Sequence, residues 1–395
     1  MDDGKTRHNG NDTHALPPQS ICDMYRKYQK MDDAAVDGDL HIIDFNRGLT
    51  EDQQMQLIAV DIIPSELIAS AEKAFKNHGK TTNGDLVEAE SLPPACTVYE
   101  HKEFPGLRLF PSLLPPESQW LMLDHLLHRE LSIPLHTNNL SQDYTIPYPP
   151  HLADATSPLS FFTYPQNNKH PAFIPINPLS SHKTLNTAQF LQKKLRWLTL
   201  GSQYNWSTRS YPPSSPTPFP ADLAELVTTL FKASFKPESG VVLLYSPKDY
   251  MPVHRDVSEE SPRGLASFTL GCDGLFIIAK EDLPREEREQ GDEPEAPPHH
   301  ASSKNSKSDS PKQPMVVIRV RSGDVVQMDG PTRWAWHAMP KVMAGTCPES
   351  LHAWPVKEGG GAPKEYARWK GYMRSKRLNI SCRQVWEGPT NDMDG

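Results

Sequence analysis

MVVIRVRSGDVVQM, residues 315–328, is predicted to form two β-strands joined by a Ser-Gly-Asp turn. Apolar, mostly β-branched residues fill both halves of the stretch, and the polar tripeptide between them favours a chain reversal. Further segments of this kind are GVVLLYS (240–246), SFTLG (267–271), GLFIIA (274–279) and RLNISCRQVW (377–386). Many short strands with turn signals between them are typical of a double-sheet jelly roll. We therefore predict an α+β fold with a double-stranded β-helix (jelly-roll) core and N-terminal helices.

Helical patterns lie mainly before and between these strands. They cover residues 21–30, 65–79, a stretch that starts near residue 117, and 218–235. Three segments are too polar to bury a core and are predicted to be disordered, namely 1–20, 282–314 and 387–395. We therefore expect a polar N-terminal extension with short helices (1–96), one domain (97–386) with an insert at 282–314, and a tail (387–395).

Composition limits the classes of protein to consider. The 395-residue chain has no apolar run near the ~20 residues of a membrane span. Its five cysteines are scattered without a Cys-x-x-Cys pair, which favours a reducing, intracellular setting. No nuclear or mitochondrial signal stands out, so nucleus, cytoplasm and mitochondrion all stay open. The net charge of −8 argues mildly against a nucleic-acid partner, although much of the acid lies in the segments predicted to be disordered.

A metal site is predicted from two separate motifs. His254 and Asp256 are spaced i and i+2, so on a strand their side chains point the same way. Alone, this pair also fits an ordinary surface loop. A second histidine from a later strand would complete a two-histidine, one-carboxylate site, which leaves positions open for Fe(II) oxygen chemistry. His337 has that placement, whereas the competing His352 lies in a loop rich in glycine and proline.

The strand RLNISCR places its polar residues on one face. Arg377, Asn379, Ser381 and Arg383 alternate with Leu378, Ile380 and Cys382. The arginines point either into solvent or into a cavity, where a guanidinium fork binds a dicarboxylate through paired hydrogen bonds. The residues alone leave both alternatives open.

Taken together, these motifs resemble the signature of the AlkB family. The likeness consists of Tyr245, then His254-x-Asp256, then His337, then a final Arg-x-Asn-x-Ser-x-Arg in which Ser381 replaces the usual threonine and keeps its hydroxyl. The flanks RWLTLGSQYNW (196–206) and RSGDVVQMDGPTRWAWHAMPKV (321–342) resemble the branch that contains the first human AlkB homologue. The resemblance covers most of 21–386, thins over 134–185 and fails over 282–314.

The resemblance implies an Fe(II)- and 2-oxoglutarate-dependent dioxygenase, with O2 as co-substrate. It implies Fe(II) ligands at His254, Asp256 and His337. It further implies that Arg377, assisted by the Tyr245 hydroxyl, binds the distal carboxylate of 2-oxoglutarate, and that Asn379 and Arg383 line the same pocket, with Arg383 near the metal-bound end. Leu243 stands where many members have an asparagine, so one polar contact with the co-substrate is missing.

The same resemblance implies oxidative demethylation of methylated bases in nucleic acid, in RNA such as tRNA or in DNA. The base must be single-stranded or flipped out to be reached. Trp197 and Tyr204 fall where the family has aromatic residues of its nucleotide-recognition lid, with core packing as the alternative. KEYARWKGYMRSKR (364–377) is basic with interleaved aromatics, which suits either a phosphate backbone or a solvated helix face.

Two other functions remain on the same fold. One is a catalytically silent, nucleic-acid-binding relative, and the other is a lyase or protein-directed oxygenase. The complete set of metal-binding residues and both arginines argue against the silent relative.

Overall fold

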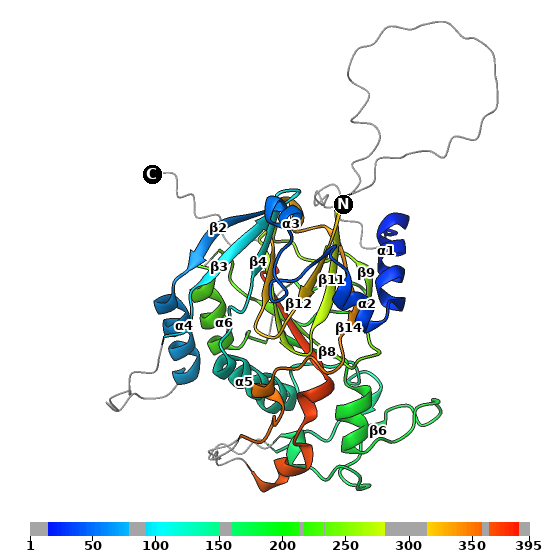
Figure 1. Ribbon diagram of the computed structural model, residues 1–395. Helices are drawn as coiled ribbons and strands as arrows, with labels where there is room; N and C mark the ends of the chain where they lie inside the picture. Colours follow the sequence, from blue (N-terminus) through cyan, green and yellow to red (C-terminus); the bar gives the residue numbers. More distant parts are fainter. Residues whose placement is uncertain are drawn as a thin grey trace, which may run out of the picture.

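The computed structural model describes residues 15–78, 92–150, 160–213, 217–232, 234–280, 314–357 and 363–386. Within them, two β-sheets face each other (Figure 1). The larger sheet has the order β2 (Leu57–Ile63), β3 (Cys96–His101), β4 (Phe104–Phe110), β13 (Val325–Met328), β10 (Leu265–Gly271), β15 (Arg377–Arg383), β8 (Ser239–Tyr245) and β7 (Trp197–Gly201). The smaller has the order β1 (Ile42–Ile43), β12 (Met315–Val320), β11 (Gly274–Ala279), β14 (Trp336–Val342) and β9 (Met251–His254).

The chain passes repeatedly from one sheet to the other. β8, β10, β13 and β15 belong to the larger sheet, while β9, β11, β12 and β14 belong to the smaller one. This alternation confirms the predicted jelly-roll core. The predicted Ser-Gly-Asp turn carries the chain from β12 to β13, and Gly323 has a φ of +92°, which favours glycine at that position. A separate two-stranded hairpin pairs β5 (Tyr144–Thr145) with β6 (Ile174–Pro175).

Helices cover the outer faces of both sheets (Figure 1). Against the larger sheet lie α4 (Ser65–Asn77), α5 (Pro116–Asp124) and α6 (Ala221–Leu230). Against the smaller sheet lies α1 (Gln19–Lys30), whose Ile21 and Tyr28 pack onto Leu275 and Ile277. Each fully buried large apolar side chain contributes about 1.5–3 kcal/mol, so these contacts fix the helices to the sheets. The predicted helices at 21–30, 65–79, near 117 and within 218–235 are all present.

α6 is joined to the segment after α5 by a buried ion-pair cluster. Arg129 donates two hydrogen bonds to Asp222, at 2.7 and 2.9 Å, and His125 Nδ1 lies 2.7 Å from the same carboxylate. Burial alone would raise the pKa of Asp222, but His125 and Arg129 together hold it well below its usual range. This carboxylate is therefore ionised in the folded protein at neutral pH.

The N-terminal segment predicted as an extension is built into both sheets. β1 pairs in parallel with β12, and β2 pairs antiparallel with β3. Ion pairs from Arg321 to Asp44 and Asp273, both at 2.7 Å, further tie this segment to the smaller sheet. The boundary predicted at 96/97 thus lies at the start of β3, beside a strand from the extension. β2 is an edge strand whose central residues are exposed although most are apolar, and its sequence LIAVDII has no polar–apolar alternation by which to recognise it.

α2 (Asp33–Gly38) and α3 (Glu51–Gln56) complete the described N-terminal helices. Of the segments predicted to be disordered, 1–14, 282–313 and 387–395 lie outside the described residues, whereas Gln19 and Ser20 already begin α1. In the ranges that are described, none of the helices combines the length and apolar character needed to cross a bilayer.

Candidate functional site

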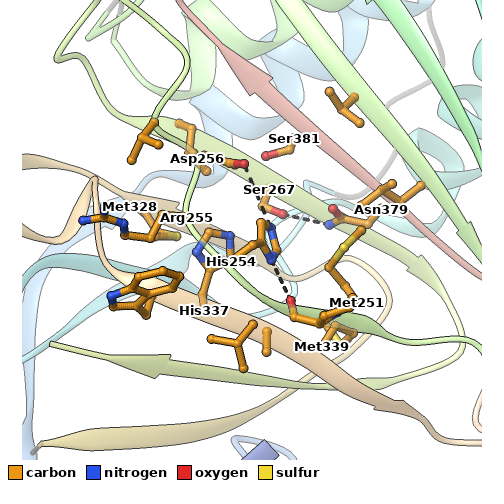
Figure 2. A pocket seen from close by; sticks show the side chains of 18 of the residues that line it. Met251, His254, Arg255, Asp256, Ser267, Met328, His337, Met339, Asn379 and Ser381 are labelled. Carbon is orange, nitrogen blue, oxygen red and sulfur yellow. Dashed lines mark hydrogen bonds and ion pairs between the residues drawn. The ribbon is translucent and has the colours of Figure 1, made fainter. Parts of the chain in front are cut away.

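A cavity of about 580 Å³ opens between the two sheets (Figure 2). One wall is the inner face of β15, from which Arg377, Asn379, Ser381 and Arg383 all line the cavity. Leu378, Ile380 and Cys382 point the other way, into the core under the helices. The arginines are buried, 2% and 6% exposed, so the alternative that they point into solvent is wrong. The strand alternation predicted from the sequence therefore holds.

His254, Asp256 and His337 come together at this cavity. His254 ends β9 and stands directly opposite His337 on β14. Asp256 follows two residues after His254, and the three possible ligand atoms lie within 4.8 Å of one another. His352, the competing histidine, instead directs Nε2 to the backbone carbonyl of Cys347 at 2.8 Å.

Backbone contacts fix both imidazoles in the tautomer that a metal needs. His254 Nδ1 donates to the carbonyl of Pro252 at 2.8 Å, and His337 Nδ1 donates to the carbonyl of Ala335 at 3.0 Å. A carbonyl oxygen only accepts, so Nδ1 carries the proton and Nε2 keeps its lone pair. Burial, with help from His254, lowers the pKa of His337 to about 4, which keeps this imidazole neutral.

The carboxylate of Asp256 is held in its charged form. Burial alone would raise its pKa, but the charge of Arg383 above all holds the pKa well below its usual range. An ionised carboxylate and two imidazole Nε2 atoms on one side of an ion leave further positions open, as in non-haem Fe(II) sites. The donor set therefore fits Fe(II).

A chain of buried charges supports Asp256. Arg383 Nη2 lies 3.2 Å from Asp256, and Arg383 Nη1 donates to Glu259 at 2.9 Å. Glu259 also accepts from Arg333 Nη2 at 3.0 Å, and Arg333 Nη1 donates to the backbone carbonyl of Asp256 at 2.8 Å. Arg383 was predicted near the metal-bound end of a co-substrate, and it borders the metal ligand itself. Glu259 and Arg333 were missed, although both lie within motifs next to the ligands.

Arg377 is a buried cation whose hydrogen bonds are incomplete. Its Nη2 donates to Thr269 Oγ1 at 2.9 Å, while Nε and Nη1 have no hydrogen-bond partner among the described residues. Burial lowers its pKa to about 10. A buried guanidinium without an anionic partner is unfavourable in free energy, so the arrangement indicates that an anionic ligand binds here. A dicarboxylate that reaches from the metal ligands to Arg377 meets that need.

The surroundings of Arg377 leave room for it. Its guanidinium lies over the ring of Tyr245, 5.4 Å from the centroid, and the two residues face each other across β15 and β8. A Cβ on Gly274 would lie 2.8 Å from Arg377 Nε, so glycine at this position avoids a clash. Asn379 donates to Ser267 Oγ at 2.8 Å and to the Phe268 carbonyl at 2.9 Å (Figure 2).

The predicted aromatic lid residues separate in the structure. Tyr204 lines the cavity and lies edge-on to Trp206, with ring centroids 4.9 Å apart. Trp197 does not line this cavity; it contacts Trp206, at 5.0 Å, and lines a smaller neighbouring cavity. Trp206 was not predicted, and it is 40% exposed at the cavity wall. The available signal was a tryptophan two residues after Tyr204, in the segment that follows β7.

The basic stretch 364–377 also differs from expectation. Its aromatic residues Tyr366, Trp369 and Tyr372 are buried in the core of the helical side. They are therefore not available to stack on bases, and contact between the basic residues of this stretch and a phosphate backbone stays a prediction. Arg368, Lys370 and Arg374 remain exposed.

Comparison with known proteins agrees with this geometry. A family model described as the 2OG-Fe(II) oxygenase superfamily matches residues 163–383. The chain is 33% identical to the N6-methyladenosine RNA demethylase ALKB1 of Pyricularia oryzae over 95% of this chain and 98% of that protein. It is 41% identical to the N6-methyladenosine RNA demethylase ALKBH of Cryphonectria parasitica (61% and 97%), and 30% identical to the tRNA demethylase abh1 of Schizosaccharomyces pombe (73% and 82%). The chain therefore belongs to the 2OG-Fe(II) oxygenase superfamily and, within it, to the AlkB-type dioxygenases.

Proposed function

We propose that this dioxygenase removes methyl groups from N-methylated bases in single-stranded or flipped-out nucleic acid. The observation that carries the proposal is one cavity that joins three features. These are the possible metal ligands His254, Asp256 and His337, the buried Arg377 whose guanidinium lacks an anionic partner among the described residues, and aromatic rings at the cavity wall. The names of the three relatives above, all RNA demethylases, support the same substrate class.

One group of residues in the cavity would bind the metal and the co-substrate. His254, Asp256 and His337 would hold Fe(II), and Arg377 would hold the far carboxylate of 2-oxoglutarate. When bound, Fe(II) and 2-oxoglutarate supply the oxidising chemistry: O2 converts 2-oxoglutarate to succinate and CO2 and hydroxylates the N-methyl group, which then leaves as formaldehyde. Arg383 keeps Asp256 ionised and oriented, so that the ligand set stays in its metal-binding form.

Tyr204 and Trp206 would receive the base. Aromatic faces stack on bases of any sequence, and a base within a duplex cannot reach a cavity between two sheets. Tyr204 is held in place by a contact between its hydroxyl and Ser258 Oγ, at 3.3 Å. The substrate is therefore a strand from which one base can turn into the cavity.

The test is a single-turnover and steady-state assay with Fe(II), 2-oxoglutarate and short oligonucleotides that carry one N6-methyladenosine. Single-stranded RNA, single-stranded DNA and duplex RNA of the same sequence are compared. Mass spectrometry of the nucleosides should show loss of the methyl group with matching formation of succinate and formaldehyde, and single strands should react faster than duplex. Binding without turnover in the presence of both co-factors would instead indicate a silent relative, and oxidation of a protein substrate alone would indicate a protein-directed oxygenase.

A further inference from the structure

A second cavity of about 280 Å³ adjoins the first. The two cavities share Leu243, Tyr245 and Met251 in their walls. Trp197 on β7 stands directly opposite Leu243 on β8, so it continues the same wall toward the edge of the larger sheet. The second cavity is thus a side lobe of the active site, and its size is near the lower end of the range for small-molecule sites.

The side lobe combines aromatic faces with a polar pair. Trp197 and Tyr250 supply the rings, and Arg196 Nη2 lies 3.4 Å from Asp249 Oδ1. Tyr250 is 51% exposed, and its ring meets Tyr25 edge-on with centroids 6.3 Å apart. A nucleobase has a flat apolar face and an edge of donors and acceptors, which these groups complement. A free anion suits the lobe less well, because Asp249 would repel it.

Aromatic contacts connect the lobe with the wall of the main cavity. Tyr204 contacts Trp206, and Trp206 in turn contacts Trp197, at centroid distances of 4.9 and 5.0 Å. Three exposed lysines flank the lobe residues in sequence, in a chain whose net charge is −8. The exposed side chains of Lys193, Lys194 and Lys248 lie close in sequence to Arg196 and Asp249. Consecutive aromatic side chains next to basic residues are typical of surfaces that bind single-stranded nucleic acid.

We propose that the side lobe binds the base of the nucleotide next to the methylated one. This inference rests on the function proposed above and adds a second, non-reacting subsite to it. The methylated base enters the main cavity, while its neighbour stacks between Trp197 and Tyr250 with its edge toward Arg196 and Asp249. The lobe therefore selects for an unpaired dinucleotide rather than for a lone modified base.

The experiment measures binding, so it does not depend on turnover. Fluorescently labelled single-stranded RNA heptamers carry a central N6-methyladenosine and either a normal or an abasic nucleotide on one side of it. Fluorescence anisotropy gives the dissociation constant for the wild type and for Tyr250→Ala. Removing the flanking base on one side should weaken binding to the wild type by about five- to 150-fold, the range for loss of one stacked base. Tyr250→Ala lacks one of the two stacking rings, so the same removal should weaken its binding by a clearly smaller factor than it does in the wild type.

Two matched variants control for indirect effects. Tyr250→Phe keeps the ring and should behave like the wild type. Arg196→Ala should weaken binding, whereas Arg108→Ala should not, because the Arg108–Glu100 pair has similar exposure but lies on β4, far along the larger sheet from β7. The inference is overturned if an abasic neighbour on either side leaves wild-type affinity unchanged, or if its effect is equal in Tyr250→Ala. Failure of the proposed function is a separate result, namely no demethylation of any methylated oligonucleotide by the wild type.

Discussion

Arg377→Lys tests the binding of 2-oxoglutarate directly. Lysine keeps the positive charge but loses the planar fork that binds a carboxylate through two hydrogen bonds. In the structure, Nη2 donates one of its two N–H groups to Thr269, which leaves its second N–H together with those of Nε and Nη1 for a ligand. A hydrogen bond to a charged group contributes roughly 1.5–3 kcal/mol, so losing one of two should weaken binding by roughly ten- to 150-fold. We expect the Michaelis constant for 2-oxoglutarate to rise by that factor.

The assay titrates 2-oxoglutarate against succinate formation, with a thermal melt of the same preparation. The melting temperature should change little, because Arg377 has no carboxylate partner among the described residues. Arg319→Lys is the matched control. Arg319 is also a buried arginine, but it is paired with Asp273 at 2.9 Å, so its replacement should lower the melting temperature and leave the affinity for 2-oxoglutarate unchanged.

A purely structural role for Arg377 predicts the opposite result. Asp324, in the turn between β12 and β13, does not supply a partner for such a role, because its carboxylate accepts from the backbone N–H groups of Ser112 and Arg321, at 2.8 and 2.7 Å. Unchanged co-substrate affinity in Arg377→Lys, together with a lowered melting temperature, would refute the assignment.

Three further outcomes are expected. Asp256→Ala should reduce turnover below detection while the protein still melts cooperatively; retained activity in the formaldehyde assay would remove Asp256 from the metal site. Glu259→Gln weakens the hold on Arg383, and loss of such a supporting contact typically costs 10–100-fold in metal affinity, which an Fe(II) titration of the anaerobic protein measures. Asp222 has a lowered pKa when folded, so the stability that it contributes is present above the unfolded carboxyl pKa of about 4 and is lost as the pH falls below it. Asp222→Asn should therefore lower the melting temperature at pH 7 and have a smaller effect as the pH falls below 4; an equal effect at pH 7 and pH 3 would contradict this.

The sequence predicts best where a strand alternates. In RLNISCR, period-two alternation separated the cavity-lining arginines from the core-facing leucine and isoleucine, because side chains on a strand must point to opposite faces. Alternation alone did not show which face of this strand lines the cavity. The answer depends on the position of β15 between β10 and β8 in the larger sheet. The resemblance to a family supplied that information, whereas placement along the sequence had already favoured His337 over His352.

The sequence predicts less well where contacts join distant segments. Glu259 and Arg333 are 74 positions apart, and their buried contact depends on how the loop after β9 meets the turn before β14. The positions of Trp197 and Trp206 relative to the cavity were harder still to predict, because they depend on the path of the loop after β7. β1 and β2 were assigned to an extension because β1 has only two residues and β2, LIAVDII, lacks the polar–apolar alternation that identifies a half-buried strand.

The two ends of the co-substrate site stand on different sheets. His254 and His337 belong to the smaller sheet and Arg377 to the larger, and both sheets are fixed by the apolar core packed between them. The separation between the two histidines and the Arg377 guanidinium is therefore set by how the two sheets pack face to face, with a usual spacing of about 10 Å between sheets, and not by a loop that can adjust. This fixed spacing selects diacids by length. A diacid one carbon shorter than 2-oxoglutarate, if it were bound at the metal ligands, would not reach Arg377.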